Sequence, residues 1–227
     1  MRKYPFYLVA TPIGNIDDIS RRALKVLGEV DLVLAEDTRV TGRLLSRCGI
    51  TARLRPYHDH NKERVTPGII SEIESGTTAA LVSDAGTPGI SDPGFYMIRA
   101  LIRGGIEFTA IPGPSSVTQA LVLSGLPTDR FCFYGYMPRK KGARERAIRE
   151  AGEARGTAVF FESPHRLVST LEAISALLPD RETVVARELT KLHEEVSRGT
   201  PGELLERYRA VKARGEITLL LAGSGRK

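Results

Sequence analysis

Residues 79–94 constrain the fold of this chain more than any other segment. The apolar run at residues 79–82 is typical of a buried strand, and it leads into a loop rich in glycine, proline and aspartate. Asp92 followed by Pro93 predicts a helix start, because aspartate caps helices and proline favours the first helical position. Ligands bind at the carboxyl ends of strands in open α/β sheets, where glycine lets them approach the main chain. The segment therefore predicts a strand, a ligand-binding loop and a helix, with a plain tight turn as the alternative.

Short apolar runs recur along the chain and alternate with helical segments, which predicts an α/β fold. The expected strands are residues 6–10, 32–35, 79–82, 108–111, 131–135, 158–161, 184–186 and 217–222. Three further pairs of a capping residue and a proline predict helix starts, at Thr66-Pro67, Ser163-Pro164 and Thr200-Pro201. Glu203 completes a capping box with Thr200.

A domain boundary is expected near the segment Ile-Pro-Gly-Pro at residues 111–114. Two prolines that flank a glycine end the preceding strand, and a helix is expected to follow at residues 115–123. We therefore expect an N-terminal α/β domain of residues 1–112 and a C-terminal α/β domain of residues 113–227.

The chain is basic, with a net charge of +6, and most of its cations are arginine. Arginine pairs with phosphate and stacks on bases. The excess of arginine is therefore consistent with a nucleic-acid partner, and equally with a basic surface that has no such partner. No apolar stretch approaches the roughly 18 residues that a membrane span needs. No signal-peptide core follows the basic start, so we expect a cytoplasmic protein with no membrane partner. The distant Cys48 and Cys132 indicate neither a disulfide framework nor a zinc site.

Polar residues also follow the first two expected strands. Residues 11–15, Thr-Pro-Ile-Gly-Asn, follow the first strand and are expected to face the loop after residue 82. Residues 35–39, Ala-Glu-Asp-Thr-Arg, place two carboxylates, a hydroxyl and a guanidinium after the second strand. Asp37 or Thr38 is expected to cap the next helix, which leaves the other polar groups for function. Neither G-x-G-x-x-G nor the P-loop pattern occurs, so standard dinucleotide and triphosphate sites are not supported.

His58 and His60 would share one face of an extended segment, which raises the question of a metal site. A catalytic zinc needs three protein ligands, and no third histidine or cysteine has suitable spacing. We therefore expect no metal, and a polar loop that contacts substrate.

Cations stand at several later strand ends. Arg166 lies four residues after Glu162 and opposes the dipole of the helix expected there, which indicates an anionic partner. Arg187 and Lys191 follow another strand, with a structural salt bridge to Glu188 as the competing account.

The densest basic run, residues 139–149, comes directly after Tyr134 and Tyr136. Basic residues beside aromatic ones indicate contact with RNA phosphates. The same helix offers opposite charges four residues apart, so an ordinary solvated face is the alternative.

Six of these segments resemble, in order and spacing, the ribosomal small-subunit methyltransferase I family of the tetrapyrrole methylase superfamily. They are Thr-Pro-Ile-Gly-Asn, Ala-Glu-Asp-Thr-Arg, His-Asp-His-Asn, Ser-Asp-Ala-Gly-Thr-Pro, Glu-Ser-Pro-His-Arg and Ala-Arg-Glu-Leu-Thr-Lys. The resemblance implies two α/β domains, a homodimer, and S-adenosylmethionine bound in the cleft between the domains. It also implies 2′-O-methylation of a decoding-region cytidine in 16S rRNA, either naked or in the small ribosomal subunit. Family members continue beyond the last strand into a small helical segment, which this chain is expected to lack together with its RNA contacts.

The expected site residues fall into three groups. The resemblance implies cofactor contacts at Pro12, Asp84, Gly86, Thr87, Ser115, Ser116, Phe161, Ala186 and Thr218. The candidates for a base that accepts the 2′-hydroxyl proton are Glu36, Asp37 and His58, which the sequence does not rank. The cations expected to hold RNA are Arg39, Arg139, Lys140, Lys141, Arg166, Arg187 and Lys191.

Two other functions stay open at this point. Another methylase of this fold would act on a tetrapyrrole ring or on the modified histidine of elongation factor 2, but arginine-rich strand ends argue against it. A nucleic-acid binding module with a non-catalytic cofactor site is the second alternative, and methyl turnover separates it from an enzyme.

Overall fold

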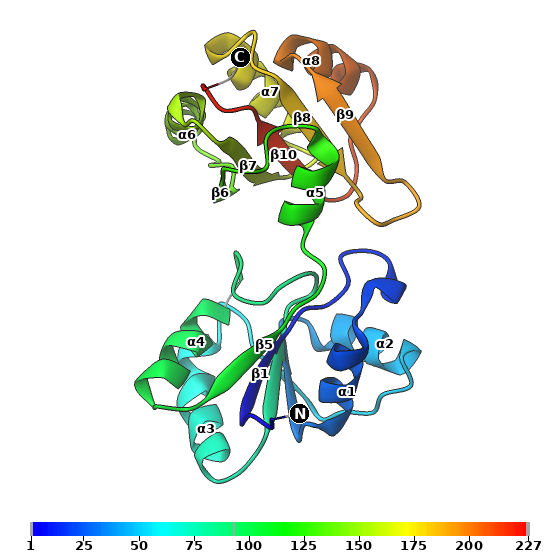
Figure 1. The fold of residues 1–227 in the computed structure, drawn as a ribbon, viewed down its shortest axis with the longest axis vertical. Helices are drawn as coiled ribbons and strands as arrows, with labels where there is room; N and C mark the ends of the chain where they lie inside the picture. The colour runs from blue at the N-terminus through cyan, green and yellow to red at the C-terminus, as the bar shows by residue number, and fades with distance from the viewer. Residues whose placement is uncertain (1, 93, 226–227) are drawn as a thin grey trace. The chain divides into compact units, whose positions relative to one another are not determined.

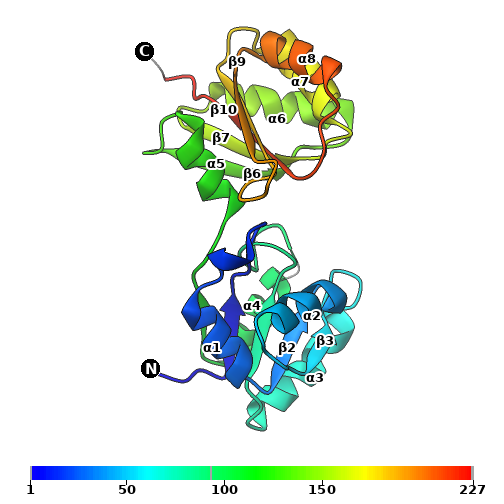
Figure 2. The ribbon, with the colours of Figure 1, turned by 90° about the vertical axis from the view of Figure 1, so that its right-hand side faces the viewer.

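The computed structural model describes residues 2–92 and 94–225 and divides into two compact units, Met1–Ser115 and Ser116–Lys227 (Figures 1 and 2). The sequence places the boundary slightly earlier, after Pro112. Residues 113–115 stay with unit 1, where the Thr87 hydroxyl donates to the Pro114 carbonyl at 3.5 Å. The first helix of unit 2 begins only at Ser116.

Unit 1 is built on a sheet of five parallel strands in the order β3-β2-β4-β1-β5. The strands are β1 (Phe6–Val9), β2 (Leu32–Ala35), β3 (Leu54–Pro56), β4 (Ala79–Val82) and β5 (Phe108–Ile111). Every residue of β1, β2 and β4 is buried. Parallel strands covered on both faces consist of continuous apolar residues, which is why the sequence predicts these three so closely.

Helices cover both faces of the unit 1 sheet (Figure 1). They are α1 (Arg21–Glu29), α2 (Thr38–Arg47), α3 (Lys62–Glu74) and α4 (Gly94–Arg103), with a short 3-10 helix, η1 (Ile16–Asp18), before α1. Apolar residues of α1 and α2 pack on one face, and those of α3 and α4 on the other. The adjacent strands β1 and β4 therefore lead into helices on opposite faces, the arrangement in which open α/β sheets bind ligands.

Unit 2 has a mixed sheet in the order β6-β7-β10-β8-β9, in which β6 and β7 pair in parallel and the other neighbouring strands pair antiparallel. Its strands are β6 (Phe131–Tyr136), β7 (Thr157–Glu162), β8 (Thr183–Arg187), β9 (Glu195–Gly199) and β10 (Ile217–Leu221). Its helices are α5 (Ser116–Ser124), α6 (Lys141–Glu153), α7 (Leu167–Leu177) and α8 (Pro201–Ala210). The last three pack with one face of the sheet in a single apolar core. The predicted capping box of Thr200 and Glu203 is present at the start of α8.

Two predicted helix starts are wrong. Pro67 lies inside α3, which begins at Lys62, because the burial of Ile69 and Ile73 outweighs the hydrogen bond that proline removes. Ser163 begins a turn instead of a helix, since its carbonyl accepts from the Arg166 and Leu167 amides and α7 starts at Leu167. The predicted Pro93 position lies outside the described residues, although Asp92 accepts a hydrogen bond from Gly94 at the start of α4.

The strands β3 and β9 are absent from the sequence prediction. Both stand at an edge of their sheet. Edge strands carry charged residues and proline, and these two read Leu-Arg-Pro and Glu-Val-Ser-Arg-Gly. Neither sequence contains the apolar run that marks the buried strands.

Candidate functional site

The loops that follow β1 and β4 are bound to each other at the carboxyl edge of the unit 1 sheet. The Thr11 amide donates to the Gly86 carbonyl at 2.9 Å, and the Gly86 amide donates to the Thr11 carbonyl at 3.1 Å. The Thr11 hydroxyl also donates to the Ser83 carbonyl. These bonds confirm the prediction that residues 11–15 face the loop after residue 82. Gly86 has φ near +83°, a conformation that favours glycine.

The second half of the loop after β4 is closed by Asp92. Its Oδ1 accepts from the Gly89 amide at 2.7 Å and from the Gly94 amide at 2.8 Å. A Cβ at Gly94 would stand only 2.7 Å from the Gly89 nitrogen, so this position needs glycine. Asp92 therefore stabilises the second half of the loop. The candidate ligand contacts are in its first half, near Asp84.

The ends of β2 and β4 are joined through Asp37 and Asp84. The Asp37 amide donates to Oδ1 of Asp84 at 3.0 Å, and Glu36 directly precedes Asp37 in the chain. Partial burial raises the pKa of Glu36, and the nearby carboxylates of Asp84, Asp92 and Asp59 raise it further. Burial also raises the pKa of Asp84. Glu36 is thus a carboxylate with increased affinity for a proton.

Asp37 and His58 lie in different surroundings from Glu36. Asp37 is the N-cap of α2, as predicted for it or Thr38, and Arg39 bonds to both of its carboxylate oxygens at 2.7–3.1 Å. Hydrogen bonds from the Arg39 side chain and backbone hold the pKa of Asp37 well below its usual range, which makes it a poor base. His58 Nδ1 is buried and has no hydrogen-bond partner among the described residues.

Three of the expected cofactor residues form one row across the unit 2 sheet. Thr218 of β10 pairs with Phe161 of β7 on one side and with Ala186 of β8 on the other. This row ends at the half-buried ring of Phe161 and lies on the face opposite Phe160, which belongs to the core under α6, α7 and α8. Of the other expected contacts, Ser115 is the last residue of unit 1 and Ser116 the first of α5.

The seven cations expected to hold RNA differ in their surroundings. Lys191 bonds to Glu188 at 2.8 Å and to Glu216, and the structural salt bridge weighed for it is present. Arg187 bonds to Glu195 at 2.6 Å. The cations with exposed side chains are Arg39, 85% exposed, and Arg139, Lys140 and Lys141.

Arg166 has a structural role that the sequence analysis missed. Its Nη2 bonds to Oε1 of Glu162 at 2.6 Å, and the Glu162 side chain is fully buried. Arg166 also donates to the Met137 carbonyl, and Thr170 and the Ser163 amide donate to Glu162. Glu162 is the last residue of β7 and comes directly after the apolar residues 158–161, and nothing in that pattern marks its burial. The placement of Arg166 near the helix start is explained by this carboxylate.

Comparison with known proteins identifies the family. The model of the Tetrapyrrole (Corrin/Porphyrin) Methylases matches residues 5–205. "Ribosomal RNA small subunit methyltransferase I" of Halalkalibacterium halodurans is 44% identical over 99% of this chain and 78% of that protein. The protein of the same name from Thermotoga maritima is 45% identical over 95% of this chain and 97% of its own length. The chain belongs to the ribosomal RNA small subunit methyltransferase I family of tetrapyrrole methylases.

Solved structures of other tetrapyrrole methylases share the fold of this methyltransferase. The methyltransferase CobJ has a TM-score of 0.72 at 18% identity, over 96% of this chain and 93% of its own. The uroporphyrin-III-C-methyltransferase from Thermus thermophilus has a TM-score of 0.67 at 21% identity, over 97% of this chain and 94% of its own. These likenesses establish the predicted tetrapyrrole-methylase fold with two α/β domains.

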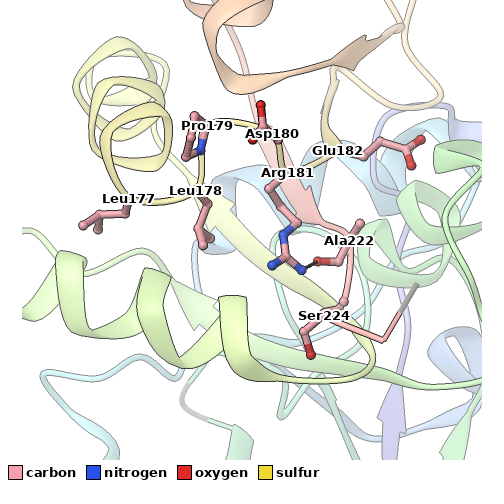
Figure 3. A pocket seen from close by; sticks show the side chains of 9 residues that line it. Leu177, Leu178, Pro179, Asp180, Arg181, Glu182, Ala222 and Ser224 are labelled. Atoms are coloured by element: carbon pink, nitrogen blue, oxygen red, sulfur yellow. Dashed lines mark hydrogen bonds between the residues drawn. The ribbon is translucent and has the colours of Figure 1, made fainter. Parts of the chain in front are cut away.

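A separate cavity of about 490 Å³ lies in unit 2 of this methyltransferase, lined by residues 177–182 and 222–224 (Figure 3). The cavity is at the end of the sheet where β8 begins and β10 ends. The row of Phe161, Thr218 and Ala186 lies toward the other end of these strands. Arg181 donates from its guanidinium to the Ala222 carbonyl beside it, drawn as a dashed line, and to the Gly152 carbonyl. Arg181 thus ties the end of β10 to α6, and the cavity is distinct from the candidate site.

Across residues 2–92 and 94–225, no group of three or more His, Cys, Asp and Glu side chains is arranged to hold a metal ion. Within that described part, none of the helices has the length and apolar character needed to span a membrane.

Proposed function

We propose that this methyltransferase moves a methyl group from S-adenosylmethionine to the 2′-hydroxyl of a decoding-region cytidine ribose in 16S rRNA. The observation that carries the proposal is the position of the Glu36 carboxylate, directly after β2, where the Asp37–Asp84 hydrogen bond joins the ends of β2 and β4. The relatives named ribosomal RNA small subunit methyltransferase I supply the class of substrate. We place the reaction in the cytoplasm, and we expect the enzyme to act as a homodimer.

The residues of each unit fit the chemistry of S-adenosylmethionine. In unit 1, the exposed Asp84 carboxylate offers an acceptor for hydroxyl or ammonium groups, near Gly86, Thr87 and Pro12 in the loops after β4 and β1. Ser115, Ser116 and the row of Phe161, Thr218 and Ala186 add hydroxyl groups and an aromatic ring suited to a ribose and an adenine. A cofactor held by strand-end loops also agrees with the absence of G-x-G-x-x-G from the sequence.

Bound S-adenosylmethionine supplies a methyl group already activated by its sulfonium. The protein therefore has chiefly to align the ribose hydroxyl with that methyl group, exclude water and remove one proton. Glu36 accepts the 2′-hydroxyl proton while the oxygen–methyl bond forms and the sulfur–methyl bond breaks. Its raised pKa favours this task over the low pKa of Asp37.

The exposed cations Arg39, Arg139, Lys140 and Lys141 bind RNA phosphates in this proposal. An arginine or lysine side chain that is not already paired with a carboxylate loses no ion pair when it binds a phosphate. Arg39 forms an ion pair with Asp37, but 85% of the Arg39 side chain is exposed, so solvent screens that pair. Phosphate contact by Arg166, Arg187 and Lys191 stays a prediction that competes with their ion pairs.

Replacing Asp84 with alanine is expected to weaken S-adenosylmethionine binding about 10- to 100-fold, the usual effect of losing a hydrogen bond to a charged group. Isothermal titration calorimetry with S-adenosylmethionine measures this affinity. Asp84→Asn keeps an acceptor for the Asp37 amide and separates loss of charge from loss of loop structure. Asp18→Ala removes an exposed carboxylate of unit 1 and serves as the control. Equal affinities in Asp84→Ala and Asp18→Ala would remove Asp84 from the cofactor site.

A further inference from the structure

The edge strand β6 contains a bulge directly before its last residue. Phe131 pairs with Thr157 and Phe133 with Val159, but the next registered pair is Tyr136 with Phe161. Two residues of β6, Tyr134 and Gly135, therefore oppose the single Phe160. Gly135 has φ near +74°, the left-handed conformation that glycine adopts without strain.

The bulge moves Tyr136 to the other face of the sheet. Regular alternation would place it on the face of Tyr134, whose ring stacks on Phe160 in the core at 4.9 Å between centroids. Instead, the Tyr136 ring contacts the edge of Phe161 at 5.3 Å, and Phe133 contacts Phe161 from the same side at 4.8 Å. β-Bulges recur next to active sites, where they re-aim a side chain.

Tyr136 consequently lies next to the row that we propose for the cofactor, at the edge of the sheet. Along the sheet, Tyr136 pairs with Phe161, Phe161 with Thr218, and Thr218 with Ala186. Tyr136 is 62% exposed, although its ring contacts Phe161 edge to face. An exposed and oriented aromatic ring at the end of this row is suited to stack on a flat apolar group.

The chain that follows Tyr136 is strongly cationic. Arg139, Lys140 and Lys141 are exposed, and α6 begins at Lys141 with no side-chain cap at its N-terminus. Arg144, one turn into α6, has an Nε that is buried and without a hydrogen-bond partner among the described residues, while its Nη1 donates to Ser169. Cations beside a helix N-terminus favour phosphate groups.

We infer that Tyr136 is a base-stacking platform for the RNA strand that carries the target ribose, with its phosphates bound by residues 139–141. Aromatic rings combined with cations are the usual means by which proteins hold unstacked RNA bases. Cations alone would bind any anion, and an exposed ring alone would suit a protein partner; the two together favour RNA. Tyr136 is here a positioning residue, and the inference rests on the proposed function.

Tyr136→Ala is expected to raise both the Kd for a fluorescent single-stranded RNA of the decoding region and the KM for unmethylated small subunits about tenfold. The affinity for S-adenosylmethionine should not change. Tyr136→Phe, which retains the ring, should restore RNA binding, whereas Tyr136→Leu, which retains only apolar area, should not. Val211→Ala is the control, because Val211 is an exposed apolar residue at the C-terminal end of α8.

The stacking role of Tyr136 and the proposed function can fail separately. If wild-type protein methylates small subunits but Tyr136→Ala leaves Kd and KM unchanged, the stacking role is wrong and the proposed function stands. If no methyl group is transferred but Tyr136→Ala still weakens RNA binding while Tyr136→Phe does not, the stacking role stands without that function. A change of oligomeric state or of cofactor affinity in Tyr136→Ala, with RNA binding intact, would overturn the inference.

Discussion

Glu36→Gln should lower kcat for RNA methylation about 10²- to 10⁴-fold, the range associated with loss of a general base. Glutamine has nearly the same shape and keeps one acceptor oxygen, but it cannot take a proton. The affinity for S-adenosylmethionine should therefore change little. Single-turnover methyl transfer to small subunits measures the chemical step apart from product release.

Asp37→Asn is the matched control for Glu36→Gln. Asparagine caps helices as well as aspartate does, so α2 should persist while the carboxylate is lost. We expect kcat to stay within about threefold of wild type in this variant, because the pKa of Asp37 is already too low for a base. A large loss in Asp37→Asn with little loss in Glu36→Gln would assign the base to Asp37.

The pH dependence follows from the raised pKa of Glu36. A base works in its deprotonated form, so activity should fall as the pH drops through the pKa of Glu36. Because burial and neighbouring carboxylates raise that pKa, the fall should begin at a higher pH than an ordinary glutamate would give. This acid limb should be absent from the residual activity of Glu36→Gln.

Arg166→Ala should destabilise unit 2 by about 3–5 kcal/mol, because it leaves a buried carboxylate without its counterion. The Glu162 side chain is fully buried, and that of Arg166 is 22% exposed. Urea unfolding followed by circular dichroism measures the loss. Glu162→Gln combined with Arg166→Ala removes the buried charge as well, so the double variant should be more stable than Arg166→Ala alone.

Arg139→Ala provides the control for this prediction. Arg139 is an exposed cation of the same unit, and its loss should change the free energy of unfolding by no more than about 0.5 kcal/mol. Should Arg166→Ala prove as stable as Arg139→Ala but bind RNA weakly, Arg166 would be a phosphate ligand and the structural role given to it here would be wrong.

The sequence predicts the buried strands well, and it misses two of the four edge strands of the described sheets, β3 and β9. β4 spans the predicted residues 79–82, because a strand covered on both faces must be apolar throughout. β3 and β9 have one open edge each, so charged residues replace the apolar signal. Pro67 within α3 shows that tertiary burial can override a local helix-start pattern.

Parts of the candidate site follow from the same logic. The contact between Thr11 and Gly86 is predictable, since parallel neighbouring strands end at one edge of the sheet. The ranking of Glu36 above Asp37 is not predictable, because it depends on which of the two carboxylates Arg39 pairs with. The face of the sheet on which Tyr136 lies depends on a single bulge. Gly135, within a predicted strand, is the sequence signal for that bulge.

The central claim is tested most directly by incubating the protein with S-adenosylmethionine labelled on its methyl group and small ribosomal subunits that lack the modification. Alkaline hydrolysis of the 16S rRNA then locates any 2′-O-methylated ribose, because that ribose resists cleavage. The account predicts one labelled methyl group per subunit, on a cytidine ribose of the decoding region, and a large loss of label with Glu36→Gln. Label on a base, label on a tetrapyrrole but not on RNA, or no transfer at all would contradict it.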